Sequence, residues 1–127
     1  WLAGVRALVV DDNDINLEVA AHLLETEGAV VSTGTNGADA LAWLRDPAHR
    51  VDVVLMDVQM PVMDGNETVR RIRSEPALAG LPVVALTAGA LQSEREQSLR
   101  AGMDDYLTKP LDLRQVVEVV LRLVHHP

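Results

Sequence analysis

The sequence predicts an α/β fold in which five parallel strands form one doubly wound sheet with helices on both faces. Strand-like apolar runs alternate with helix-like stretches along the 127 residues. Runs such as Val53–Met56 lack polar alternation, which is typical of strands buried on both faces of a parallel sheet. Right-handed crossovers then place helices on both sides, and a chain of this length fits a single domain with one core.

Five short apolar segments are predicted to form the strands, at residues 5–11, 29–34, 52–57, 82–87 and 104–107. Val and Leu dominate the first, third and fourth of them, so we expect these three to be buried on both faces. The expected order across such a sheet is 2-1-3-4-5. Strand order then reverses between the first and third strands, and ligands bind beyond the carboxyl ends of the strands at that point.

Helices are predicted between the strands, at about residues 13–27, 36–45, 63–74, 91–101 and from 111 onward. In the first, Ile15, Val19 and Leu23 recur every four residues, and Gly28 is a stop signal. The fourth is the least apolar, because residues 92–98 are all polar. The residues expected on the inner faces of the other helices are Ala38, Leu41 and Leu44, then Thr68, Val69 and Ile72, and finally Leu113, Val116, Val117, Val120 and Val124.

The composition argues against several classes of function. A net charge of -8 disfavours binding to a nucleic-acid backbone, which attracts basic surfaces. The absence of cysteine excludes a disulfide framework and a thiolate metal site. No apolar run approaches the length of a membrane span, and no signal peptide is visible. We therefore expect a cytoplasmic domain without direct membrane contact. Because the chain begins at Trp1, we interpret residues 1–127 as one domain excised from a larger protein, which is free to carry a membrane anchor.

Three aspartates follow two of the predicted strands where strand order reverses. Asp11 and Asp12 end the first strand and Asp57 ends the third, so the fold would bring them into one cleft. Carboxylates repel one another and together need a cation. Three of them with free coordination positions suit Mg²⁺, which prefers oxygen ligands, with Mn²⁺ as an alternative. The competing interpretation is that these aspartates cap the helices that follow.

Other polar residues near the strand ends indicate a bound phosphate group. Thr87 ends the fourth strand and could donate to a phosphoryl oxygen, and the small Ala88 leaves room for that group. A threonine that caps the next helix is the alternative for Thr87. Lys109 follows the last strand, Pro110 keeps it out of helical geometry, and its ammonium suits a phosphate as a point charge. Tyr106 is either a core aromatic residue or one that moves between buried and exposed positions.

The loop after Asp57 is predicted to be stiff. Pro61 lacks an amide donor, and Asp64–Gly65 is a turn signal in which Gly65 can adopt a positive φ. A stiff loop could direct a backbone carbonyl, that of Gln59, toward the metal.

Five motifs occur in order along the chain, and they are Val9–Asn13, Leu55–Pro61, Met63–Gly65, Leu86–Ala88 and Ala101–Pro110. Together they resemble the receiver domain of two-component signalling, the phosphoacceptor module of response regulators and hybrid sensor kinases. The resemblance runs from Val5 to about Val124 and implies a flavodoxin-like fold. It also implies that residues 1–127 are a single receiver domain.

The resemblance implies a role for each site residue. Asp57 is the nucleophile that takes a phosphoryl group from a phosphohistidine, and the domain assists its own phosphorylation and dephosphorylation. The implied metal ligands are Asp12, Asp57 and the Gln59 carbonyl, while Asp11 contacts the metal through water. Lys109 is implied to pair with the phosphoryl group, Thr87 to move toward that group beside Ala88, and Tyr106 to move inward. The implied structural residues are Pro61, Gly65 and Pro110, the last in a cis Lys109–Pro110 peptide.

The motif details also suggest a setting. Residues 11–16 and 57–65 look most like receivers attached to hybrid histidine kinases. The implied partner is then a histidine phosphotransfer domain or the kinase core of the same parent protein. Nothing basic or helix-turn-helix-like follows the last helix, which argues against a DNA-binding output. A stand-alone single-domain response regulator is the alternative setting.

Two further hypotheses belong to other classes of protein. A small haloacid-dehalogenase-type phosphatase would use the Asp-x-Asp spacing of Asp12–Asp14, but it needs a later acidic pair near Thr87. A flavin-binding module of the same topology needs a glycine-rich or hydroxyl-rich phosphate loop after the first strand. Asp11 and Asp12 stand at that place and would repel the phosphate.

Overall fold

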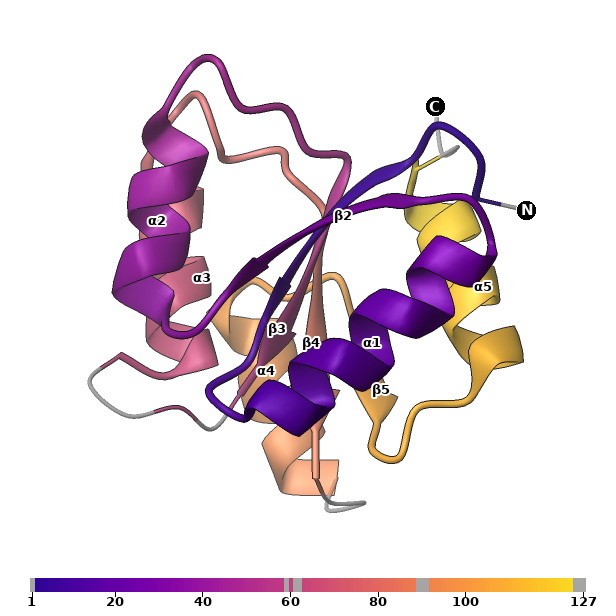
Figure 1. The fold of residues 1–127 in the computed structure, drawn as a ribbon. Helices are drawn as coiled ribbons and strands as arrows, with labels where there is room; N and C mark the ends of the chain where they lie inside the picture. Colours follow the sequence, from indigo (N-terminus) through magenta and orange to yellow (C-terminus); the bar gives the residue numbers. More distant parts are fainter. Residues whose placement is uncertain (1, 59, 61–62, 89–91, 125–127) are drawn as a thin grey trace.

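Strands and helices alternate along the chain, as the sequence predicts (Figure 1). The structure is a computed structural model that describes residues 2–58, 60, 63–88 and 92–124. Within these residues the elements are β1 (Arg6–Val10), α1 (Asp14–Thr26), β2 (Val30–Gly34), α2 (Gly37–Arg45), β3 (Val53–Asp57), α3 (Gly65–Ser74), β4 (Val83–Thr87), α4 (Gln92–Ala101), β5 (Asp105–Thr108) and α5 (Leu113–Val124). None of these described helices has the length and apolar character needed to cross a membrane.

All strand pairs are parallel, and the order across the sheet is β2-β1-β3-β4-β5. The predicted order is therefore confirmed. β1 lies between β2 and β3, so Val9 is in register with Thr33 on one side and with Leu55 on the other. The carboxyl ends of β1 and β3 are consequently neighbours at the point where strand order reverses.

The sheet is buried on both faces, because each central strand contributes alternate residues to two separate cores. Val9 and Leu55 belong to the core under α1 and α5. Leu8 and Val54 belong to the core under α2 and α3. Figure 1 shows α1 and α5 on one side of the sheet and α2 and α3 on the other. This two-sided burial explains the absence of polar alternation in the central strands.

The repeat formed by Ile15, Val19 and Leu23 is not the buried face of α1. Ile15 is 71% exposed and Val19 is 49% exposed. The buried residues of this helix are instead Leu17, Ala20 and Leu24. Leu17, Ala20 and Leu24 are themselves spaced three and four residues apart, so they share one face of the helix, and this face packs into the core against the sheet. Gly28 ends the helix region with a φ of 95°, which confirms its role as a stop signal.

Three smaller predictions about the helices also need correction. Ala38 is exposed and lies at the rim of the inner face of α2, which Ala40, Leu41 and Leu44 form. α3 begins at Gly65, two residues later than predicted, because Asp64 is its N-cap. In α5 the fully buried part of the predicted stripe is Val116, Val117 and Val120, while its ends, Leu113 and Val124, are partly buried.

Candidate functional site

The three aspartates that the sequence singles out converge at one edge of the sheet. Asp11 and Asp12 directly follow β1, and Asp57 is the last residue of β3. One carboxylate oxygen from each of the three lies within 4.8 Å of the others. Asp11 is 1% exposed and Asp57 is 6% exposed, whereas Asp12 faces solvent. The cluster therefore has two buried carboxylates and one that a solvated ion can reach.

Lys109 supplies the cation that the buried carboxylates need. Its Nζ atom lies 2.9 Å from Asp11 Oδ2 and 3.5 Å from Asp57 Oδ2. The side chain is 22% exposed, and Lys109 is the only lysine of the sequence. Its backbone N–H donates to Thr87 O at 2.8 Å, which ties it to the end of β4. The Lys109–Pro110 peptide bond is cis.

The hydrogen bonds exclude helix capping as the role of these aspartates. The N-cap of α1 is Asn13, whose side chain accepts from the Asn16 N–H at 3.1 Å. Asp11 Oδ1 accepts from the Asn13 N–H at 2.9 Å and so fixes the turn that leads into the helix. The N-cap of α3 is Asp64, seven residues beyond Asp57. The cost of burying the Asp11 and Asp57 carboxylates is therefore offset by the ammonium of Lys109 and, for Asp11, by the Asn13 N–H in the loop. Neither aspartate is buried because it caps a helix.

Gly65 is needed at this site for a different reason from the one expected. It is the first residue of α3, and its φ does not lie in the left-handed region that the turn signal suggested. A Cβ at this position would lie 2.4 Å from the Asp57 carbonyl oxygen and 2.9 Å from Val58 Cα. The Gly65 N–H also donates to Val58 O at 2.9 Å. The start of α3 thus lies directly against the strand end that presents Asp57.

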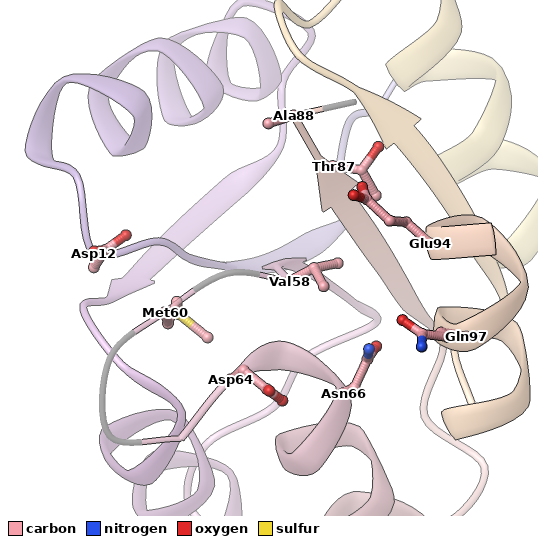
Figure 2. Close-up of a pocket in the computed structure, with 9 residues that line it drawn as sticks. All are labelled: Asp12, Val58, Met60, Asp64, Asn66, Thr87, Ala88, Glu94 and Gln97. Atoms are coloured by element: carbon pink, nitrogen blue, oxygen red, sulfur yellow. The ribbon is translucent and has the colours of Figure 1, made fainter. Parts of the chain in front are cut away.

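A pocket opens between Asp12 and the end of β4. Thr87 and Ala88 form one wall of it, α3 and α4 form others, and Figure 2 shows Asp12 on the side opposite Thr87. Thr87 is 3% exposed and contributes a buried part of this wall. The complete lining is Asp12, Val58, Met60, Asp64, Asn66, Thr87, Ala88, Glu94 and Gln97.

Several lining residues were not anticipated from the sequence. Asn66 and Gln97 approach each other across the gap between α3 and α4 in Figure 2. Glu94 points its carboxylate toward Thr87 in the same view. No motif marks these three positions, because only the packing of α3 beside α4 brings them to the pocket.

The remaining predicted residues fall into two groups. Tyr106 is half-buried on β5, lies under the Arg95 side chain and is not among the residues that line the pocket. Gln59 and Pro61 lie outside the described residues. The site that the described residues form therefore contains the three aspartates, Lys109, Thr87 and Ala88.

Comparison with known proteins places this site in a family. The family model for the response regulator receiver domain matches residues 7–121. The sensor protein GacS of Pseudomonas syringae pv. syringae is 47% identical over 120 residues, which cover 92% of this chain and 13% of that protein. An uncharacterised 14.6 kDa protein of Leptolyngbya boryana is 40% identical over 119 residues, covering 94% of this chain and 89% of that protein. The chain thus spans a small part of the sensor kinase and most of the small protein.

Solved structures agree with the sequence relatives. The receiver domain of the sensor histidine kinase PA1611 from Pseudomonas aeruginosa PAO1, which has a magnesium ion coordinated in its active site cleft, superposes with a TM-score of 0.86 at 37% identity. That match covers 96% of this chain and 98% of the other. The receiver domain of Ssk1 from Saccharomyces cerevisiae, crystallised with the histidine phosphotransfer protein Ypd1, gives a TM-score of 0.87 at 26% identity, with 98% and 91% covered. On these matches, and with its acidic cluster at the switch point of the sheet, the chain belongs to the response regulator receiver domain family.

Proposed function

We propose that Asp57 accepts a phosphoryl group from a phosphohistidine in a two-component phosphorelay. The observation that carries this proposal is a nearly buried carboxylate whose Oδ2 atom lies 3.5 Å from Lys109 Nζ, beside two more carboxylates. In the proposed step, an Asp57 oxygen forms a bond to phosphorus while the phosphorus–nitrogen bond of the donor breaks. The donor imidazole, protonated on its other ring nitrogen, keeps the electron pair of that bond and leaves as the neutral ring. Transfer of this kind depends on positioning and on charge stabilisation more than on covalent chemistry by the protein.

The acidic cluster fits a divalent ion, because hard carboxylate oxygens are the ligands that Mg²⁺ takes. We propose that Asp12, Asp57 and the Gln59 carbonyl hold Mg²⁺ directly and that Asp11 acts through water. When bound, the ion neutralises negative charge on the carboxylates and on the transferring group. Asp12 is the exposed member of the cluster and therefore the one that meets the arriving ion.

The other site residues receive the phosphoryl group once it is attached. Lys109 is placed to pair with a phosphoryl oxygen, since its ammonium already lies between Asp11 and Asp57. Thr87 contributes its hydroxyl and Ala88 leaves space for the group. Loss of the phosphoryl group removes negative charge from the site beside Thr87 and Lys109, so the two states differ by a local change of charge. We propose that Tyr106 follows this change from its place on β5.

For the parent protein we propose a hybrid sensor histidine kinase, because GacS is a sensor kinase of which this chain matches only 13%. Residues 1–127 would then form one receiver domain of that protein, on the cytoplasmic side. A stand-alone response regulator is the second candidate. The relative from Leptolyngbya boryana favours it, since the chain covers 89% of that small protein.

The donor that we propose is a histidine phosphotransfer domain or the kinase core of the same parent. The exposed apolar side chains Ile15 and Val19 lie on α1, which starts two residues after Asp12. A small pocket that Val19 helps to line is also lined by Lys109 and Pro110, among others. An apolar helix face of the donor can cover this patch while its phosphohistidine reaches Asp57. The co-crystal of Ypd1 with the Ssk1 receiver supports a partner of this class.

Direct phosphorylation tests the proposed function. Incubation with acetyl phosphate or phosphoramidate and Mg²⁺ should add one phosphoryl group to the protein, as measured by intact mass spectrometry. Asp57→Asn should abolish the addition, because its amide is a poor nucleophile. Asp64→Asn is the matched control, since it changes another acidic residue at the pocket while keeping a good N-cap residue. Unchanged labelling of Asp57→Asn, or catalytic turnover of many phosphate monoesters, would contradict the proposal.

The response of thermal stability to Mg²⁺ tests the metal ligands separately. At a Mg²⁺ concentration 100 times its Kd, linkage should stabilise the wild-type protein by about 2.7 kcal/mol. Asp12→Asn should remove most of this stabilisation, because the cluster loses its exposed carboxylate. Asp14→Asn, an exposed change two residues away in the first turn of α1, should keep it. Equal shifts of Tm in wild type and Asp12→Asn would exclude Asp12 as a ligand.

A further inference from the structure

Helix α4 is held to the rest of the domain by very little apolar surface. Its only buried residues are Ser98 and Ala101, and its one large apolar residue within the described range, Leu99, is 45% exposed. Ser98 Oγ is buried without a hydrogen-bond partner among the described residues. Few buried apolar contacts and an unsatisfied polar group are features of a segment with low local stability. The position of α4 must therefore depend on other contacts.

The C-terminal end of α4 has such a contact. Arg73, on α3, donates from Nε at 3.0 Å and from Nη2 at 2.8 Å to the carbonyl oxygen of Gly102. Its Nη2 atom also lies 2.7 Å from Asp104 Oδ2, and its Nη1 atom donates to Leu81 O at 2.6 Å. This guanidinium fastens the turn between α4 and β5 at the end of the sheet away from Asp57.

In the N-terminal half of α4, Arg95 makes the polar contacts that join this helix to β5 within the described residues. Its guanidinium carbon lies 4.6 Å from the centroid of the Tyr106 ring, which is a cation–π contact. Nη1 lies 3.5 Å from Tyr106 Oη, and Nη2 lies 3.5 Å from Thr108 Oγ1. Nε is buried and has no partner among the described residues. Arg95 thus covers the outer side of β5 just before Lys109.

We propose that Arg95 is a positioning residue that latches α4 to β5 in the unphosphorylated domain. The inference rests on the proposed function. It identifies a contact that phosphorylation of Asp57 should weaken. The latch acts on Thr108, which is the neighbour of Lys109, and on Tyr106, two residues earlier in the same strand. It therefore stabilises the arrangement in which Lys109 is paired with Asp11 at 2.9 Å.

The direction of the effect follows from the charges at the site. Lys109 Nζ is closer to Asp11 than to Asp57, at 2.9 Å against 3.5 Å. A phosphoryl group on Asp57 adds negative charge there and attracts Lys109 away from Asp11. In the proposed coupling the end of β5 adjusts to this shift, and Arg95, which contacts Thr108, opposes that adjustment. A phosphoryl group consequently favours the state in which Arg95 no longer contacts β5. By linkage, a variant with a weaker Arg95 contact should bind a phosphoryl group or its mimic more tightly, by the factor by which that contact was weakened.

Two measurements on the whole domain test the latch. The first is amide hydrogen exchange of residues 92–101 and 105–108 in the unphosphorylated protein. Arg95→Ala should speed exchange in both segments about three-fold, the size expected for loss of one partly exposed cation–π contact. The second is the affinity for beryllium fluoride with Mg²⁺, a mimic of the phosphoryl group. Arg95→Ala should bind it about three-fold more tightly.

Matched variants separate the latch from a change of charge or of helix propensity. Arg100→Ala removes an arginine from the same helix, one whose side chain is 79% exposed and pairs only with Glu96 among the described residues. It should resemble wild type in both measurements. Arg95→Lys keeps a cation for the ring but loses the planar two-nitrogen reach, so it should lie between wild type and Arg95→Ala.

The outcomes are distinguishable. Exchange in Arg95→Ala equal to that in Arg100→Ala would overturn the latch. Faster exchange with an unchanged or weaker affinity for beryllium fluoride would make Arg95 a purely structural contact and would also overturn the coupling. If wild type failed to bind beryllium fluoride at all, the proposed phosphoacceptor function would fail, and the coupling with it. The exchange data would still decide whether Arg95 holds α4.

Discussion

Replacing Lys109 with methionine should slow the phosphorylation of Asp57 by acetyl phosphate about 100-fold, the effect typical of removing one preorganised charge or donor from a reacting group. Methionine fills similar space but brings no charge. Lys109 Nζ lies 3.5 Å from Asp57 Oδ2, so it is the protein cation best placed to stabilise negative charge on the incoming group. The rate is measured by intact mass spectrometry over time at fixed Mg²⁺.

The same variant should also lose stability when no divalent ion is present. Asp11 accepts from Lys109 at 2.9 Å and is 1% exposed, so its carboxylate would be left buried beside Asp57 without the cation. An unpaired buried charge of this kind costs about 2 kcal/mol or more in free energy of unfolding. Urea unfolding measures this loss, and Mg²⁺ should restore part of it.

Lys109→Arg is the matched control for both effects. It keeps a positive charge between Asp11 and Asp57 with a different shape, so the loss of stability should be smaller than for Lys109→Met. Because Lys109 is the only lysine of the sequence, no other lysine can replace it in either variant. A wild-type phosphorylation rate for Lys109→Met would show that the ammonium takes no part in the transfer.

Replacing Gly65 with alanine should lower the free energy of unfolding by about 3 kcal/mol, near the upper end of the range for overpacking. The added Cβ would lie 2.4 Å from the Asp57 carbonyl oxygen, 2.9 Å from Val58 Cα and 3.1 Å from the Asp57 carbonyl carbon. These are backbone atoms of a central strand end, so they cannot move aside as a flexible side chain would. Phosphorylation should slow as well, because the clash displaces the strand end that carries Asp57.

Gly80→Ala provides the control for the substitution itself. Gly80 lies between α3 and β4, and a Cβ there would meet nothing within 4 Å. Its stability should stay equal to that of wild type or rise by about 0.5 kcal/mol through reduced freedom of the unfolded chain. Urea unfolding of the two variants under the same conditions makes the comparison. Equal stability of Gly65→Ala and Gly80→Ala would show that α3 can move away from β3 at little cost.

The strands and the acidic cluster were predictable because their signals are local. Continuous apolar runs identify strands covered on both faces, and each of the five lies within two residues of its predicted bounds. The positions of Asp11, Asp12 and Asp57 at strand ends then follow from the strand order alone. Lys109 was assigned in the same way, as the residue after the last strand.

The exposed face of α1 shows where local signals mislead. Ile15 and Val19 form the more conspicuous apolar repeat, yet Leu17, Ala20 and Leu24 are buried. Apolar residues spaced three and four apart can form more than one stripe on the same helix. Which stripe is buried depends on how the helix packs against the sheet. The large residues that remain outside are those that the proposed donor would cover.

The sequence by itself determined the fold class, the strand order and the residues at the switch point, because strand burial and parallel topology leave few alternatives. Only the tertiary structure decided how Lys109 divides its contacts between Asp11 and Asp57, why position 65 must be glycine, and that Arg95 covers Tyr106 and Thr108. The physical reason is that these are contacts between segments far apart in the chain. Their distances depend on how the helices pack against the sheet, which no local pattern of residues records.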